Sequence, residues 1–174
     1  MKSKAAVLYK AGQPFEVCEV DVQSPKAGEV LVEIVAAGVC HTDYSVKTGQ
    51  LAAPLPAILG HEGAGVVREV GEGVTTVQPG DHVIALWRLA CGDCEYCDAS
   101  RPALCAAGTE IRASGRLQDG TSRFSHAGRE IEHFAGVSSF SNFTVIPEGA
   151  VLKIPRDLPL ELAALMGCAV ITGV

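Results

Sequence analysis

The chain has 174 residues, of which 48% are hydrophobic and only 5% aromatic, and its formal net charge is −6 at pH 7. This length fits one globular domain, or one large domain with part of a second. The acidic balance, without any block of lysine and arginine, argues against nucleic-acid and anionic-membrane partners. The first apolar run, residues 5–9, is too short for a signal peptide, so we expect a cytoplasmic protein.

Seven cysteines are present, and four of them fall within fifteen residues. The odd number and the absence of a signal-like start favour cytosolic thiols that hold metal over a disulfide framework. The 19 glycines and 9 prolines indicate many turns and short strands around an aliphatic core. We therefore expect a mainly β or mixed architecture rather than a helical bundle.

Short β-branched runs separated by Gly- and Pro-rich turns predict strands through the first half of the chain. The predicted strands cover residues 4–9, 15–22, 30–36, 63–70 and 82–87. A short helix is predicted over residues 42–47, with Thr42 or Asp43 near its start and Gly49 beyond its end. The regular strand spacing indicates a barrel or a sandwich.

The hydrophobic periodicity disappears between about residues 91 and 140, where we predict a long irregular lobe. A loop of this length inside a compact domain needs its own metal or a functional reason to stay ordered. Strands are predicted again at residues 143–146 and 151–154. Pro159 then opens a helix that carries Glu161 in its first turn.

Residues 162–174 form an uncharged apolar run at the end of the chain. The run is too short to span a bilayer. A natural terminus rarely leaves such a run exposed. We therefore expect a buried helix that runs into a strand whose continuation is missing, and we interpret the chain as truncated.

Four cysteines carry the strongest local signal, namely Cys91, Cys94, Cys97 and Cys105. Their short spacers allow four thiolates to meet on one tetrahedral Zn²⁺. Closed four-sulfur coordination leaves no position for substrate, so the predicted site is structural. An iron–sulfur cluster is the alternative, but the bacterial ferredoxin run has a three-residue last spacer and a following proline, whereas Ala106 follows a seven-residue spacer here. A disulfide framework would require a secreted chain.

Cys40, His61 and Cys168 are a second candidate set, although their spacing alone does not show which residues meet in space. Cys40 follows a predicted strand and precedes His-Thr-Asp, while His61 precedes Glu62 after a proline-rich turn. Buried cysteine, neutral histidine and a neighbouring carboxylate are the donor types of a three-ligand zinc site with one open position.

On the basis of these residues, the chain resembles the zinc-dependent alcohol dehydrogenases of the medium-chain dehydrogenase/reductase family. The resemblance is greatest to the long forms, which include the liver-type and glutathione-dependent formaldehyde enzymes. It covers nearly the whole chain and rests on Gly38-Val-Cys-His-Thr-Asp43, Leu59-Gly-His-Glu-Gly-Ala-Gly65, Val77-Gln-Pro-Gly-Asp81, the four-cysteine lobe, Gly120-Thr-Ser-Arg-Phe124, Phe140-Ser-Asn-Phe-Thr144 and Gly167-Cys168.

The resemblance implies a GroES-like β-barrel catalytic domain over residues 1–168, with short helices and a structural zinc lobe at about residues 91–105. Residues 169–174 would be the truncated start of a cofactor-binding domain. No Gly-x-Gly-x-x-Gly stands in a strand–turn–helix context, so the Rossmann domain is absent from this chain. NAD would accordingly be bound mainly by a domain missing here.

The resemblance also implies the roles of individual residues. Cys40, His61 and Cys168 would hold a catalytic zinc, with Glu62 behind it and Asp43 bonded to the other nitrogen of His61. Two zinc ions per chain are expected, one catalytic and one structural. The catalytic ion would lower the pKa of a bound alcohol, so that hydride can pass to NAD.

Further roles follow from the same match. Thr42 would carry the alcohol proton outward, and Ser45 stands where many family members end this relay on a histidine, so we expect a relay through Ser45 and water. The remaining assignments place His41 at the cofactor pyrophosphate, Thr172 near the nicotinamide, and Leu51, Trp87, Phe134 and Ala135 around the substrate pocket.

The leading hypothesis is therefore an alcohol dehydrogenase that oxidises small-molecule alcohols to aldehydes or ketones, or catalyses the reverse, with NAD. We expect the isolated chain to be inactive and the complete enzyme to be a homo-oligomer. The alternative is a non-enzymatic zinc-stabilised module or a truncated gene product, which would bind one zinc and would not need the second ligand set. A zinc-free reductase would need neither set.

Overall fold

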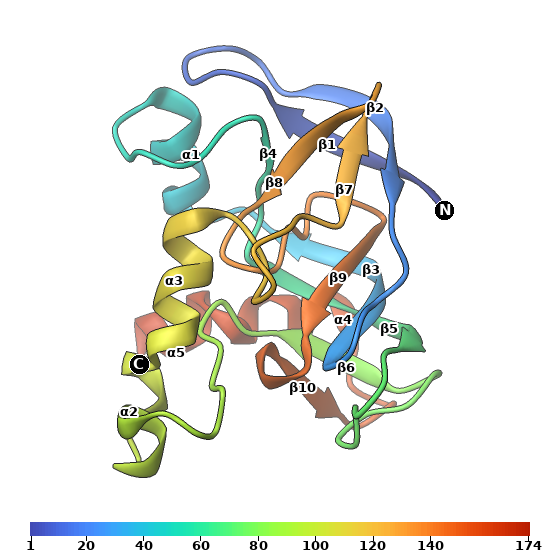
Figure 1. Ribbon diagram of the computed structural model, residues 1–174, viewed down its shortest axis with the longest axis vertical. Coiled ribbons are helices and arrows are strands. Elements are labelled where there is room, and N and C mark those ends of the chain that lie inside the picture. Colours follow the sequence, from blue (N-terminus) through green and yellow to red (C-terminus); the bar gives the residue numbers. More distant parts are fainter.

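Ten strands form a small barrel and a five-stranded sheet in the computed structural model, which describes residues 1–174 (Figure 1). The closed barrel contains, in spatial order, β1 (Lys2–Leu8), β2 (Glu16–Val22), β7 (Phe124–His126), β8 (Arg129–His133) and β4 (Ala57–Ile58). The sheet contains β10 (Val151–Ile154), β6 (His82–Ala85), β5 (Glu62–Val70), β3 (Glu29–Gly38) and β9 (Phe143–Pro147). The predicted mainly β fold with a barrel is confirmed.

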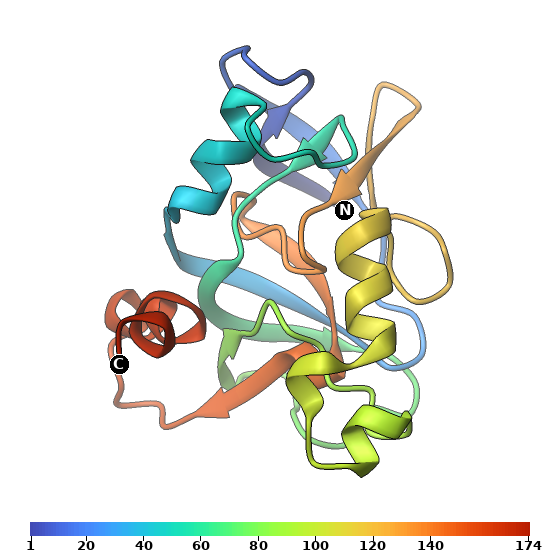
Figure 2. The same ribbon diagram turned by 90° about the vertical axis from the view of Figure 1, so that its left-hand side faces the viewer.

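The helices are short and lie around the strands. They are α1 (His41–Thr48), α2 (Glu95–Asp98), α3 (Ala106–Ser114), α4 (Leu160–Ala163) and α5 (Ala169–Gly173), with 3-10 turns at Pro102–Leu104, Glu148–Ala150 and Ala164–Gly167. Figure 2 shows α1, α3 and the carboxyl-terminal helices on the side that faces the viewer. None of the helices has the length and apolar character that a membrane crossing requires.

The side chains of β3 and β9 point alternately toward the sheet core and the barrel core, and so they connect the two parts of the fold. Val30 and Ile146 face each other across the β3–β9 ladder and belong to the core of the sheet, while their neighbours Leu31 and Val145 form the next pair and belong to the core of the barrel. Successive side chains of a strand point to opposite faces, so one pair of strands serves both cores.

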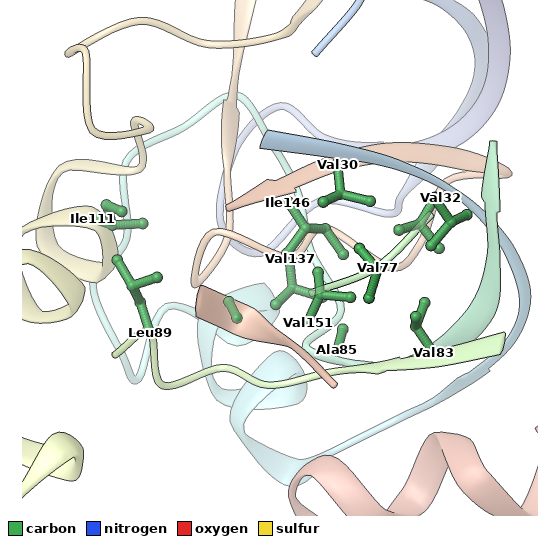
Figure 3. Close-up of a cluster of buried hydrophobic side chains, with 12 residues drawn as sticks. Val30, Val32, Val77, Val83, Ala85, Leu89, Ile111, Val137, Ile146 and Val151 are labelled. Atoms are coloured by element: carbon green, nitrogen blue, oxygen red, sulfur yellow. The ribbon is translucent and has the colours of Figure 1, made fainter. Parts of the chain in front are cut away.

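The core of the sheet is a cluster of 12 buried aliphatic side chains (Figure 3). Valines dominate it, as expected for side chains that pack on a pleated surface. Ile111 of α3 lies beside Leu89 at the edge of this cluster, so α3 is anchored to the sheet by a fully apolar contact. This contact fixes one wall of the site described below.

Most predicted elements are confirmed, with shifted ends. Residues 42–47 lie within α1, which ends at Gly49 in the left-handed conformation at φ 81°. The irregular lobe predicted for residues 91–140 is wrong in part, because α2, α3, β7 and β8 lie inside it. A glycine inside α3 and the three-residue length of β7 removed the periodicity on which the prediction depended.

The prediction of a buried helix that runs into a strand is wrong in part for residues 162–174, because helices form there but no strand follows them. This run forms the end of α4, a 3-10 turn and α5, with no strand, and Ile171 is 68% exposed. Only its small residues face the sheet: Ala163 and Ala164 are buried, whereas Leu162 is 61% exposed. A helical period therefore divides the run into a buried face and an exposed face.

One buried ion pair connects the barrel to the sheet. Arg123, whose side chain is fully buried, donates two hydrogen bonds of 2.8 and 2.5 Å to the carboxylate of Glu29 at the start of β3. Asp119 accepts a third bond from the same guanidinium at 3.0 Å. Since Arg123 directly precedes β7, this bidentate pair fixes the position of a barrel strand relative to β3.

Replacing Arg123 by Met is expected to lower the free energy of unfolding by about 3–5 kcal/mol, because the carboxylate of Glu29 stays buried without its partner. Urea denaturation of the zinc-loaded chain measures the loss. Lys2→Ala, which breaks an exposed ion pair with Asp21, is the matched control and should change the stability by less than about 1 kcal/mol. A double variant with Glu29→Met should recover most of the loss; equal effects for Arg123→Met and Lys2→Ala would contradict the argument.

Candidate metal centres and adjoining cavity

The four cysteines of the lobe converge. The sulfur atoms of Cys91, Cys94, Cys97 and Cys105 all lie within 4.8 Å of one another. The Cys91 and Cys97 sulfurs are 4.0 Å apart, which is far beyond a disulfide bond and close to the distance of about 3.8 Å that tetrahedral Zn–S geometry requires. All seven cysteines of the chain are free thiols. The donor set therefore fits a closed structural zinc site.

Backbone amides in the lobe favour the thiolate form that binds metal. Hydrogen bonds from the amides of Ala106 and Cys97 lower the pKa of Cys94 to about 6. Burial raises the pKa of Cys105, but backbone amides of Gly108 and Cys91 outweigh it and bring the pKa below its usual value. Thiolates are the metal-binding form of cysteine, so α3 and the loop before it are already arranged around negative charge at these two sulfurs. A hydrogen bond with the Asp93 side chain instead raises the pKa of Cys91 to about 12.

A second cluster gathers four residues from three different places in the chain. The donor atoms of Cys40, His61, Glu62 and Cys168 lie within 4.8 Å of one another. Cys40 directly precedes α1, His61 directly precedes β5, which begins at Glu62, and Cys168 directly precedes α5. His61 and Glu62 are 4% and 2% exposed, so their polar groups are buried and need hydrogen-bond partners or a cation.

Asp43 determines the orientation of His61. This carboxylate, 2% exposed, lies 3.2 Å from Nδ1 of His61 and accepts hydrogen bonds from the amides of Cys40 and Gly60, each at 3.1 Å. Burial lowers the pKa of His61, but Asp43 outweighs that effect and raises it above its usual value. With Nδ1 donating to Asp43, Nε2 is left as the ligand atom for a metal.

The two sulfurs of this cluster differ in their environment. Burial opposes ionisation of Cys40, but hydrogen bonds from Thr42 and His61 lower its pKa below the usual value. Burial raises the pKa of Cys168 to about 11. A divalent cation would neutralise both thiolates, and two sulfurs with one imidazole form the three-ligand set of an open zinc site.

Glycines make room for this cluster. A Cβ atom on Gly38 would lie 2.1 Å from the Glu62 carboxylate, so only glycine allows that side chain to pack against the end of β3. Gly60 has φ +87°, and a Cβ there would lie 2.5 Å from the hydroxyl of Ser139. A side chain at Gly60 would displace the loop that carries His61, and one at Gly38 would displace the Glu62 carboxylate.

A cavity of about 250 Å³ opens beside the second cluster. Thr42, His61 and Cys168 form its polar end, and it is lined also by Leu51, Ala52, Ala53, Trp87, Arg112, Phe134 and Ala135. The rings of Trp87 and Phe134 meet His61 edge-on, with centroids 6.4 and 5.7 Å away. All four residues predicted for the substrate pocket therefore line one cavity next to the candidate metal ligands.

The other predicted site residues lie around this cavity rather than in it. Ser45 is one turn along α1, with its hydroxyl 3.3 Å from Nδ1 of the exposed His41. Thr172 lines a neighbouring hollow of about 500 Å³ that also reaches Cys168 and Trp87. Its hydroxyl lies 4.0 Å from the Cys168 sulfur.

Ala52, Ala53 and Arg112 also line the cavity and were not predicted. The two alanines carry no chemical signal and follow Leu51 in an irregular segment. Arg112 lies in the last turn of α3, which falls inside the segment predicted as irregular. Arg112 could have been found by recognising that helix. Within it, Ile111 faces the hydrophobic core and the next residue, Arg112, faces the cavity.

Two metal sites of different kinds predict a count of two zinc ions per chain in native mass spectrometry. Cys105→Ser should leave only the ion of the second cluster and should disorder the lobe. Cys168→Ser should leave only the lobe ion, with the lobe intact. Cys18→Ser is the control, since Cys18 belongs to neither cluster and should leave both ions. A wild-type count of one, unchanged in Cys168→Ser, would show that the second cluster holds no metal.

Asp43→Asn keeps the size of the side chain and removes its charge. Because Asp43 orients a metal-binding imidazole, we expect the affinity for the second zinc to fall about 10- to 100-fold, with the lobe ion unaffected. Competition with a chelator measures each constant. Asp157→Asn, at an exposed position outside both clusters, should change neither; equal affinities for Asp43→Asn and Asp157→Asn would refute the orienting role.

Comparison with known proteins agrees with this geometry. Residues 26–156 match the family model "Alcohol dehydrogenase GroES-like domain". The S-(hydroxymethyl)glutathione dehydrogenase of Escherichia coli O1:K1 is 47% identical over 175 aligned positions, which cover 100% of this chain and 47% of that protein. The chain therefore spans about half the length of the curated relatives that it matches.

Two solved structures are similar over 99% of this chain. The alcohol dehydrogenase zinc-binding domain protein from Burkholderia ambifaria has a TM-score of 0.92 and 39% identity, and 47% of its chain is covered. Benzyl alcohol dehydrogenase from Acinetobacter calcoaceticus has a TM-score of 0.91 and 36% identity, with 46% of its chain covered. The family match over most of the chain and the shared fold lead to one conclusion: this chain belongs to the alcohol dehydrogenase GroES-like domain family.

Proposed function

We propose that this chain is the catalytic domain of a zinc-dependent alcohol dehydrogenase, which oxidises alcohols to aldehydes or ketones, or catalyses the reverse, with NAD. The observation that carries the proposal is the cluster of Cys40, His61 and Cys168 at the polar end of an otherwise mostly apolar cavity. A closed metal site would have no need of such a cavity. A purely structural zinc module would need only the four-cysteine site and would lack this second cluster.

The four residues of the second cluster would hold zinc, with Cys40, His61 and Cys168 as ligands and Glu62 behind them. Zinc at this position supplies a Lewis acid that lowers the pKa of an alcohol hydroxyl. Trp87 and Phe134 would then exclude water and orient the carbon chain, since both rings pack edge-on against His61. The four lobe cysteines would hold the structural zinc.

Thr42 is proposed to accept the alcohol proton. It lines the cavity, and its hydroxyl lies 3.6 Å from the sulfur of Cys40. The proton would leave through Ser45 and water toward solvent. The hydrogen bond between Ser45 and the exposed His41 supports an outward path along the first turn of α1.

NAD is proposed to be bound mainly by a domain outside these residues, with His41 at the pyrophosphate and Thr172 near the nicotinamide. The hollow lined by Thr172 and Cys168 supports this placement, because it lies beside the cavity and shares Trp87 with it. In this proposal residues 1–168 form the catalytic domain and residues 169–174 begin the cofactor-binding domain. The curated relatives are about twice as long as this chain, which agrees with a second domain.

The substrate is proposed to be a small alcohol or aldehyde, including hydroxymethyl adducts of thiols. The names of the E. coli and Acinetobacter relatives, an S-(hydroxymethyl)glutathione and a benzyl alcohol dehydrogenase, support this range. A cytoplasmic location and a homo-oligomeric complete enzyme stay predictions. Seven free thiols support the cytoplasmic location.

A chimera tests the proposed function, with this chain joined to the carboxyl-terminal half of the E. coli relative. We expect NADH formation from benzyl alcohol, followed by absorbance. Thr42→Val should lower kcat about 10²- to 10⁴-fold because the hydroxyl that accepts the proton is lost, whereas Thr42→Ser should keep most of the rate. A two-zinc chimera that forms no NADH would contradict the function, and equal rates for Thr42→Val and Thr42→Ser would contradict the role of Thr42.

A further inference from the structure

Ser139 is a buried polar residue that the proposed mechanism does not use. The residue is 2% exposed, and its hydroxyl donates a hydrogen bond of 3.1 Å to the backbone carbonyl of Glu62. Its backbone amide donates a second bond, of 3.0 Å, to the carbonyl of Gly60. The two bonds reach the residues on either side of His61. One residue therefore holds the chain both before and after this candidate metal ligand.

Glycines on both sides of His61 and Glu62 enclose the side chain of Ser139. A Cβ atom on Gly60 would lie 2.5 Å from its Oγ, and a Cβ atom on Gly63 would lie 2.9 Å from its Cβ. Ser139 thus packs directly against the segment that carries the two donors. These short distances keep the segment from moving toward Ser139, and the two hydrogen bonds oppose its movement away.

The turn that presents Ser139 is held in a costly backbone conformation. Ala135 and Ser138 have positive φ values of 55° and 54°, which residues other than glycine rarely adopt. The hydroxyl of Ser138 stabilises the turn by accepting a hydrogen bond of 2.9 Å from the amide of Phe134. Val137 anchors it in the core of the sheet (Figure 3). Such strain persists only where the surrounding structure over-determines it, and it is concentrated at functional sites.

We propose that Ser139 is a positioning residue of the second metal cluster, whose hydroxyl fixes the backbone of His61 and Glu62 and thereby the geometry and affinity of zinc binding. The inference rests on the proposed function, since it concerns the same metal centre. Asp43 orients the imidazole of His61 through Nδ1, whereas Ser139 holds the main chain that carries it. Two separate interactions therefore position one ligand.

Replacement of zinc by Co²⁺ provides the measurement, because the visible absorption of this ion depends on its coordination geometry. Subtracting the spectrum of Cys168→Ser, which retains only the lobe ion, isolates the second cluster. Chelator competition gives the affinity for each ion. Ser139→Ala removes the hydroxyl, and Ser139→Thr keeps it. Ser141→Ala is the matched control, because Ser141 is also buried and its hydroxyl bonds to Ser3 and to the carbonyl of Phe143 instead.

Ser139→Ala should bind the second ion about 10-fold more weakly and shift its Co²⁺ absorption bands, because the backbone of a metal ligand loses its support. The affinity for the lobe ion should stay unchanged, which also shows that the variant is folded. Ser139→Thr and Ser141→Ala should match the wild type in both measurements, although Ser141→Ala also loses a buried hydrogen bond.

The inference is overturned if Ser139→Ala keeps the wild-type affinity and bands, if it weakens both ions alike, or if Ser139→Thr behaves as Ser139→Ala does. An equal loss in Ser141→Ala would also overturn it, since a general loss of stability would then explain the effect. A wild-type chain that binds cobalt only in the lobe would refute the proposed metal centre, and the role of Ser139 with it. A chimera that forms no NADH but shows the expected cobalt pattern would refute the dehydrogenase function and leave the positioning role intact.

Discussion

The carboxylate of Asp43 is the constraint on which the second metal cluster depends. β3 and β5 pair so that Gly38 lies opposite Glu62, and the segments that follow β3 and precede β5 therefore begin side by side. Asp43 joins these segments because it accepts hydrogen bonds from the backbone amides of Cys40 and Gly60 and faces the imidazole of His61. The carboxylate of Asp43 thus fixes both the backbone of these segments and the imidazole of His61, so the donor atoms are arranged before a cation binds.

Close approach of the backbone brings in the third ligand from a distant part of the sequence. A Cβ on Gly167 would lie 2.4 Å from the carbonyl oxygen of Ala85, so the 3-10 turn before Cys168 can only lie against the end of β6 because it carries glycine. Ala163 and Ala164 pack on the sheet with equally small side chains. These small residues allow the segment to lie close against the sheet, and this position brings the sulfur of Cys168 to the other ligands.

Sequence reasoning was most successful where the determinant was local. Runs of β-branched residues between Gly- and Pro-rich turns located the long strands, and the spacing of Cys91, Cys94 and Cys97 already placed three sulfurs within reach of one ion. The meeting of Cys40 with Cys168 could not be derived from a separation of 128 residues, and needed the resemblance to a family. The lobe prediction failed because α3 contains Gly108 and begins without an acid, which hid its helical pattern.

That hidden helix couples the lobe to the cavity. Cys105 directly precedes α3, and its sulfur accepts hydrogen bonds from the backbone amides of Gly108 and Cys91. Ile111 anchors the same helix in the core of the sheet, and Arg112 places a guanidinium beside Trp87 at the cavity wall. The cysteine cluster that contributes no open coordination position therefore still shapes the cavity, because it fixes the first turn of the helix whose last turn forms the wall.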